Sequence, residues 1–234
     1  MTAFPLLVFD LDGTLIDSLQ DLTSALNRML ARRELASYTP AEVRPMIGDG
    51  TTILIERAFA GRGTAPRPGD HDAFVADYTD HAVVATHAYP GIAATCGRLR
   101  AQGWRFAVCT NKTEKAARLV LAALGLGPWF AAIGGGDSFA ARKPDPAHLL
   151  RTIEAACGAP ERAVMTGDHL NDVLVARRAG LPSIFAAWGY GAAAMGREAT
   201  AVAHHFTELA ELAPRLLEER RAAISTPPPP QPDD

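Results

Sequence analysis

The hydrophobic residues near the start of the chain form one short, uninterrupted run. Residues 6–9 are all apolar, and the run stops at Asp10. A strand buried on both faces of a sheet has this continuous pattern, whereas a strand with one exposed face alternates apolar and polar residues. The run therefore predicts a buried strand over Leu6–Phe9.

The period of the apolar positions changes after this strand. From Ser18 to Ala31 they recur at three- and four-residue intervals, which is typical of an amphipathic helix. Thr39-Pro40-Ala41-Glu42 has the pattern of a capping box with proline at the first helical position, and it predicts another helix start. Helices are also predicted over Thr51–Ala60 and Ala73–Ala85. The stretch from Asp17 to His87 is thus predicted to contain helices and no strand.

After this stretch, predicted strands and helices alternate. The predicted strands are Arg105–Cys109, Ala131–Ile133, Ala163–Thr166 and Ser183–Ala187, with a short edge strand at Val202–His205. The predicted helices are Ile92–Ala101, Glu114–Leu124, Ala147–Ala156, Asp172–Ala179 and Glu208–Arg221. This alternation implies a parallel sheet that is covered by helices on both faces.

We therefore predict an α/β protein in which an all-helical domain interrupts the core after the first strand. The predicted core comprises residues 1–16 and 88–224, and the predicted helical domain comprises residues 17–87. Residues 225–234 are predicted to be a disordered tail, because five of the last nine residues are prolines.

Composition and charge exclude several classes of function. The chain has 234 residues with a formal net charge of −3 and no basic stripe, which argues against nucleic-acid binding. No apolar stretch approaches the ~20 residues needed to span a bilayer, and the N-terminus lacks the features of a signal peptide. The three cysteines are widely spaced without a CxxC motif, so we expect reduced thiols and a cytoplasmic protein.

Polar residues with catalytic potential follow the predicted strands directly. In open parallel sheets, ligands bind beyond the carboxyl ends of the strands, so we expect these residues to converge at one edge. Mg²⁺ is the ion expected there, because it prefers carboxylate oxygens and often bridges to phosphate. The converging residues are Asp10 and Asp12, Thr110 with Asn111 and Lys112, Lys143, and Asp168 with Asp172.

The pairing of Asp10 with Asp12 indicates phosphoryl transfer. Residues two apart in an extended segment face the same side, so both carboxylates can reach one reacting group. Asp10 is the candidate nucleophile on phosphorus, which would form an aspartyl-phosphate. Asp12 is the candidate acid that protonates the leaving oxygen and the base that later activates water. Lys143 would supply a cation for a phosphate oxygen.

Four stretches in order resemble the motifs of the haloacid dehalogenase-like hydrolase superfamily. They are Asp10-Leu11-Asp12-Gly13-Thr14, Thr110-Asn111, Lys143-Pro144, and Gly167-Asp168 with Asp172. The resemblance implies a Rossmann-like core, an inserted helical cap and a Mg²⁺ site. It also implies that the metal is bound by Asp10, by the backbone carbonyl of Asp12 and by Asp168. By the same resemblance, Thr110, Asn111 and Lys143 bind the phosphoryl group. Asp172 is implied to support a metal-bound water or to orient Lys143.

Within this superfamily the sequence is most similar to bacterial phosphoglycolate phosphatases. Ile47-Gly48-Asp49-Gly50, Thr110-Asn111-Lys112 and Gly134-Gly135-Gly136-Asp137 carry the likeness, whereas His169 departs from it, because serine more often follows Gly-Asp. The likeness implies that the substrate is a small phosphorylated metabolite, 2-phosphoglycolate. The oligomeric state, monomer or homodimer, stays open.

A small phosphorylated acid must be held through its phosphate and its carboxylate. The helical domain offers two candidate donors for the carboxylate. One is the set of backbone N–H groups around Gly48–Thr51, where a glycine-rich chain enters a helix. The other is Arg57, whose guanidinium matches a carboxylate, although an arginine paired with Glu56 or with solvent is an equal alternative.

Alternative functions use the same motifs. A phosphosugar mutase similar to β-phosphoglucomutase, or a sugar-phosphate phosphatase, would share the site but need a different cap. A dehalogenase would not need an acid at Asp12, since halide leaves unprotonated. A stable phospho-aspartate switch is disfavoured for a related reason: Asp12 is placed to activate water.

Overall fold

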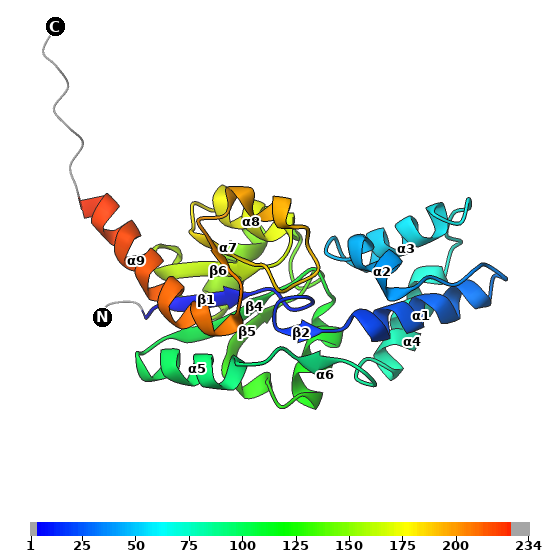
Figure 1. The fold of residues 1–234 in the computed structure, drawn as a ribbon, viewed down its shortest axis with the longest axis horizontal. Helices are drawn as coiled ribbons and strands as arrows, with labels where there is room; N and C mark the ends of the chain where they lie inside the picture. Colours follow the sequence, from blue (N-terminus) through cyan, green and yellow to red (C-terminus); the bar gives the residue numbers. More distant parts are fainter. Residues whose placement is uncertain (1–3, 226–234) are drawn as a thin grey trace, which may run out of the picture.

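The computed structural model describes residues 4–225, which form two parts of unequal size (Figure 1). The larger part contains a parallel sheet with helices on both faces, and the smaller part contains the helices α1 to α4. All but the first residue of the predicted tail at 225–234 lie outside the described residues. The predicted fold class, a parallel α/β core with an all-helical insert, is confirmed.

Six parallel strands form the sheet of the core, in the order β5-β4-β1-β6-β7-β8. The strand bounds are β1 Leu6–Phe9, β4 Arg105–Cys109, β5 Phe130–Gly134, β6 Ala163–Gly167, β7 Ser183–Ala186 and β8 Ala201–Ala203. The edge strand predicted near Val202 is therefore present.

The first strand lies in the middle of the sheet, between β4 and β6, and all four of its residues are fully buried. Leu7 and Phe9 belong to the hydrophobic cluster on one face, and Leu6 and Val8 belong to the cluster on the other. The continuous apolar run in the sequence thus reflects burial on both faces.

Helices cover both faces of this sheet. Buried side chains of α7 and α8 pack on the face that holds Leu6 and Val8, and those of α5, α6 and α9 pack on the opposite face. The bounds are α5 Ile92–Ala101, α6 Glu114–Ala123, α7 Pro146–Ala155, α8 Leu170–Arg178 and α9 Leu209–Ser225. Short 3₁₀ helices lie at Gly127–Trp129, Pro160–Arg162, Ala193–Glu198 and Phe206–Glu208.

The insert consists of α1 Leu19–Ala31, α2 Pro40–Val43, the 3₁₀ turn Arg44–Met46, α3 Thr51–Ala60 and α4 Asp70–Asp80. The capping box predicted for α2 is present: the Thr39 side chain accepts a hydrogen bond from the Glu42 amide, and the Glu42 carboxylate accepts one from the Thr39 amide. These two bonds satisfy amides that have no partner inside the helix.

The helix predicted over Ala73–Ala85 occupies Asp70–Asp80 instead, so it begins and ends earlier than predicted. A contact with α1 explains its early end. The buried Asp21 carboxylate on α1 accepts hydrogen bonds from the backbone amides of Val84, Ala85 and Thr86, at 2.8–3.0 Å, and from the Thr86 hydroxyl at 2.7 Å. The chain therefore leaves the helix before these residues and is fixed to α1.

Two short strands, β2 Ile16–Asp17 and β3 His87–Ala88, pair antiparallel where the chain leaves and re-enters the core. The sequence does not predict this pair, because two-residue strands show no measurable alternation. The predicted domain limits, which separate residue 16 from 17 and 87 from 88, divide each of these strands. We keep the division into core and helical domain as a proposal, with this strand pair as the connection.

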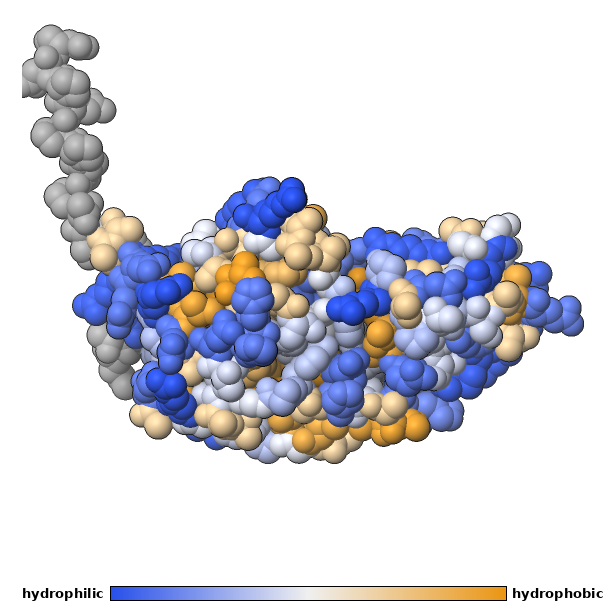
Figure 2. All heavy atoms as spheres, viewed as in Figure 1, coloured by the Kyte–Doolittle hydropathy of each residue, from blue (hydrophilic) through white to orange (hydrophobic). Residues whose placement is uncertain are grey.

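No helix within residues 4–225 is long and apolar enough to cross a membrane. On the face seen in Figure 2, hydrophilic residues predominate, and the hydrophobic residues form scattered patches.

The Asp21 contacts predict a stability defect. Asp21→Ala leaves backbone amides of residues 84–86 without an acceptor, so we expect a loss of about 2–3 kcal/mol in the free energy of unfolding, measured with urea. Burial raises the pKa of Asp21, but the hydrogen bonds from Thr86 and Ala85 outweigh it and hold this pKa below its usual value. The stabilisation is therefore complete above the pKa of an unfolded aspartate, and it is lost as the pH falls through the lower folded value.

A matched control is Asp72→Ala, because the Asp72 side chain is 93% exposed. We expect this control to change the unfolding free energy by less than about 0.5 kcal/mol. Equal losses in the two variants would contradict the structural role of Asp21.

Candidate active site

The candidate site lies at the carboxyl edge of the three central strands. Asp10 follows β1, Thr110 follows β4 and Asp168 follows β6. Parallel pairing aligns these strand ends, since Phe9 is level with both Val108 and Thr166. The sheet thus brings together polar residues that lie far apart in the sequence.

Lys143 connects two of the predicted carboxylates. Its Nζ lies 2.7 Å from Oδ1 of Asp10 and 2.6 Å from Oδ1 of Asp172, and its side chain is 1% exposed. Burial alone would lower the pKa of Lys143, but the charges of Asp10 and Asp172 raise it well above its ordinary value. The ammonium therefore stays charged and holds the two carboxylates together.

Asp10, Asp168 and Asp172 form a buried cluster in which one carboxylate oxygen of each lies within 4.8 Å of the others. Burial raises the pKa of Asp10 to about 6, and burial together with the charges of Asp10 and Asp172 raises that of Asp168 to about 8. Three carboxylates share one buried ammonium, so Lys143 compensates their negative charge only in part. A set of oxygen donors with excess negative charge fits a hard divalent cation.

Asp168 is fixed by hydrogen bonds from residues of two loops. Its Oδ1 accepts a bond from the Thr14 hydroxyl at 3.0 Å, and its Oδ2 accepts one from the Tyr190 amide at 2.7 Å. Because the side chain is held on both oxygens, its orientation toward the other carboxylates is set before any ligand binds.

Asp12 lies in a different environment from Asp10. Its Oδ1 accepts hydrogen bonds from the Ser18 hydroxyl at 2.5 Å and from Lys112 Nζ at 3.1 Å, and its Oδ2 lies 3.0 Å from the same Nζ. The Lys112 ammonium is also 4.4 Å from the centroid of the Tyr78 ring on α4. Two carboxylates at neighbouring positions thus have separate lysine partners, Lys143 for Asp10 and Lys112 for Asp12.

The helical insert contacts this edge of the sheet through Gly48. Its carbonyl oxygen accepts hydrogen bonds from the side-chain amides of Asn111, at 3.2 Å, and Asn171, at 2.7 Å. Gly48 has a φ of +119°, and a Cβ there would lie 2.6 Å from the His169 ring. Only glycine allows this close approach. The neighbouring Arg44 guanidinium donates to the Gly189 carbonyl and fixes the insert at a second point.

The insert and the core together line a partly open cavity with about 40 Å³ of water-accessible space, enough for about three water molecules. The core lines it with catalytic candidates and the insert lines it with backbone and apolar side chains. The lining residues are Asp10, Asp12, Thr110, Asn111 and Lys112 from the core, and Leu22, Ile47, Gly48, Gly50, Thr51 and Leu54 from the insert.

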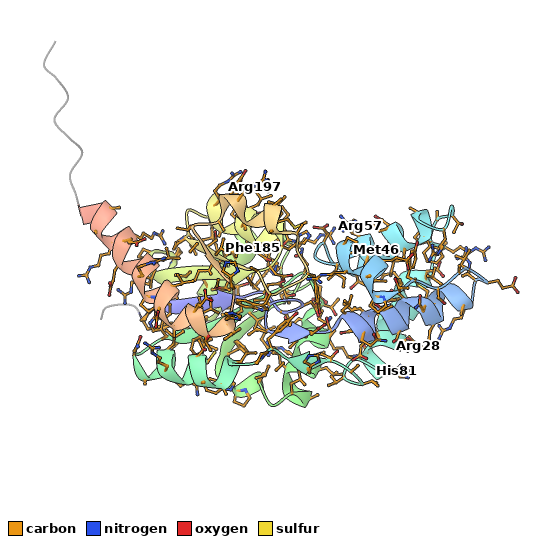
Figure 3. The ribbon with its side chains drawn as sticks, viewed as in Figure 1. Arg28, Met46, Arg57, His81, Phe185 and Arg197 are labelled. Atoms are coloured by element: carbon orange, nitrogen blue, oxygen red, sulfur yellow. The ribbon has the colours of Figure 1, made fainter. Side chains whose placement is uncertain are left out.

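Every predicted site residue lies at this edge except Arg57. Arg57 pairs with Asp49 at 2.5 Å and donates to the Met46 carbonyl at 3.0 Å, and it does not line the cavity. Figure 3 shows Arg57 and Met46 together on the helical insert. Arg57 is thus paired locally, as in the alternative interpretation, but its partner is Asp49 and not Glu56.

His169, the departure from the family pattern, packs beneath Gly48. Its backbone amide donates to Oδ2 of Asp172 at 3.0 Å, which fixes the first turn of α8. Burial lowers the pKa of the imidazole, so the ring is neutral at pH 7. The residue therefore shapes the loop without adding charge to the carboxylate cluster.

Two features of the site are not predicted from the sequence: the burial of the Lys112 side chain and the hydrogen bond from Asn171 to Gly48. Lys112 directly follows the predicted Thr110-Asn111 pair, and its side chain is 5% exposed. Asn171 lies between Asp168 and Asp172 in the sequence. Each of the two residues is next to a predicted site residue in the sequence, and this adjacency is the feature that could have identified them.

Comparisons with known proteins agree with this geometry. Residues 4–180 match the model of the haloacid dehalogenase-like hydrolase family. A phosphoglycolate phosphatase from Agrobacterium fabrum is 45% identical over 190 residues, which cover 80% of this chain and 82% of that protein. One from Mesorhizobium japonicum is 42% identical over 219 residues, covering 91% and 96%.

Solved structures have the same fold. A predicted phosphoglycolate phosphatase from Haemophilus somnus has a TM-score of 0.83 and 28% identity, covering 91% of this chain and 99% of that one. CbbY from Rhodobacter sphaeroides in complex with phosphate has a TM-score of 0.76 and 26% identity, covering 88% and 96%. The motifs, the fold and these relatives together establish that the chain belongs to the haloacid dehalogenase-like hydrolases.

Proposed function

We propose that this hydrolase is a Mg²⁺-dependent phosphatase that converts 2-phosphoglycolate to glycolate and phosphate through an aspartyl-phosphate intermediate. The observation that carries the proposal is the small cavity in which Asp10 and Asp12 face the backbone of the insert. The similarity to phosphoglycolate phosphatases over most of the chain supports the choice of substrate.

In the first step, an Asp10 oxygen attacks phosphorus while the bond from phosphorus to the ester oxygen breaks. Asp12 donates a proton to that oxygen, and the alcohol leaves. In the second step, Asp12 takes a proton from water as the water attacks the aspartyl-phosphate, which releases phosphate and restores Asp10. Lys143 stays beside Asp10 and compensates the negative charge that gathers around the phosphoryl group.

The carboxylate cluster would hold the metal. Asp10, Asp168 and the Asp12 carbonyl are the proposed ligands, and Asp172 orients Lys143, to which it is bonded at 2.6 Å. When bound, Mg²⁺ neutralises charge on the phosphoryl oxygens. Thr110 and Asn111 line the same cavity and are the proposed donors to those oxygens.

A sugar phosphate is the second candidate substrate. A variant of CbbY from Rhodobacter sphaeroides was solved with xylulose-(1,5)bisphosphate. That protein is 25% identical to this chain, whereas the two phosphoglycolate phosphatases are 45% and 42% identical over most of it, so 2-phosphoglycolate is the preferred candidate.

Substitution of the two aspartates tests the proposed chemistry. Asp10→Asn should abolish turnover, because an amide does not attack phosphorus. Asp12→Asn should lower kcat for 2-phosphoglycolate by roughly 10²–10⁴-fold, the usual value of acid–base catalysis. Steady-state phosphate release measures both, with Asp72→Asn as the exposed control. Turnover near that of the wild type in either site variant would refute the mechanism.

Substrate preference tests the role of the insert. We expect kcat/KM for 2-phosphoglycolate to exceed that for glucose 6-phosphate by at least roughly 100-fold. Gly48→Val places a side chain against the His169 ring, so it should reduce this preference while lowering p-nitrophenyl phosphate hydrolysis much less.

Gly97→Val is the matched control for Gly48→Val, because a Cβ at Gly97 meets nothing within 4 Å. It should leave the preference of the wild type intact. A hexose phosphate as the best substrate by a wide margin would overturn the choice of 2-phosphoglycolate and leave the phosphatase chemistry in place.

A further inference from the structure

Lys112 places a buried positive charge on the wall of the cavity. Its side chain is 5% exposed, and its Nζ lies 3.0 Å from Oδ2 and 3.1 Å from Oδ1 of Asp12. A buried ammonium costs free energy unless it is compensated, and it is rarely placed in a small cavity without a function there. One role of Lys112 is to hold Asp12 by hydrogen bonds. The residues that line the cavity indicate a second role.

Neither Lys143 nor Arg57 lines the cavity. Lys143 is paired with Asp10, and Arg57 is paired with Asp49. The insert contributes the apolar side chains Leu22, Ile47 and Leu54 to the wall. Among the lining residues within 4–225, Lys112 is thus the one cation available to a second anionic group of a substrate.

We infer that Lys112 is the specificity-determining residue of the site, and that its ammonium binds a carboxylate carried by the leaving group. The inference rests on the proposed function. Asp12 must lie within hydrogen-bond reach of the ester oxygen to protonate it. Lys112 is itself hydrogen-bonded to Asp12, so its ammonium lies within two hydrogen-bond lengths of that oxygen.

The chemistry of the substrate matches this spacing. In a phosphoester of a 2-hydroxy acid, the carboxyl carbon is two bonds from the ester oxygen. The carboxylate is therefore close to the ester oxygen. Lys112 is close to the same oxygen, because it is hydrogen-bonded to Asp12. A longer chain between the ester oxygen and the anion would place the anion farther from the ester oxygen, and the apolar lining residues Leu22 and Leu54 offer it no charge. The selected class is thus phosphoesters of short 2-hydroxy acids.

The helical insert fixes the position of this cation. The Tyr78 ring on α4 lies 4.4 Å from the Lys112 ammonium, and the ring is buried. An aromatic face attracts a cation without neutralising its charge. The insert therefore contacts Lys112 through Tyr78 without adding a second negative charge, and Asp12 is the carboxylate paired with the ammonium.

The test compares two substrates that differ only in this anion, 2-phosphoglycolate and ethyl phosphate, at saturating Mg²⁺. In the wild type, kcat/KM should favour 2-phosphoglycolate. In Lys112→Met, the ratio of the two kcat/KM values should fall by roughly 10–100-fold, the effect expected for losing one hydrogen bond between charged groups. Lys115→Met, which changes an exposed lysine on α6, should keep the ratio of the wild type.

The possible results separate the alternatives. Equal losses for both esters in Lys112→Met would mean that Lys112 acts only through Asp12, and would overturn the inference while leaving the phosphatase proposal in place. A wild-type enzyme that releases phosphate from neither ester would overturn both. If Lys112→Met does not fold, as judged by circular dichroism, the wild type decides: a ratio near one for the two esters contradicts a carboxylate site.

Discussion

The constraint on which the site depends is the repulsion between four carboxylates at one edge of a sheet. Asp10, Asp168 and Asp172 are buried with one carboxylate oxygen of each within 4.8 Å of the others, and Asp12 follows Asp10 by two positions. Two lysines compensate part of this charge from inside the protein, and each has its own partners. Burial is the largest cause of the raised pKa values of Asp10 and Asp168, and the neighbouring carboxylates add to it. A divalent cation would compensate the charge that the lysines leave.

The helical insert completes the site by backbone and apolar contacts. The Gly48 carbonyl joins two core asparagines, one following β4 and one on α8, so the insert is held by the same loops that carry Asp168 and Thr110. The proposed phosphoryl-binding residues Thr110 and Asn111 therefore lie in the same loop as one of the contacts that hold the insert.

The sequence predicts the core strands and the residues that follow them, because burial on both faces and motif spacing are local properties of the chain. It does not predict contacts between distant segments. The amides of residues 84–86 bond to Asp21 on α1, which shortens α4, and Arg57 pairs with Asp49 and stays outside the cavity. The sequence places Lys112 beside Thr110 and Asn111 at this edge, but only the packing shows that it is buried against Asp12.

If the carboxylate cluster works only with a divalent cation, removing that cation must stop the reaction. This can be measured as phosphate release from 2-phosphoglycolate by protein that has been treated exhaustively with EDTA, before and after Mg²⁺ is added back. Chelation should abolish release, because the charge of the cluster is then uncompensated, and Mg²⁺ should restore it. Full activity that persists after exhaustive chelation would show that the cluster does not need the cation.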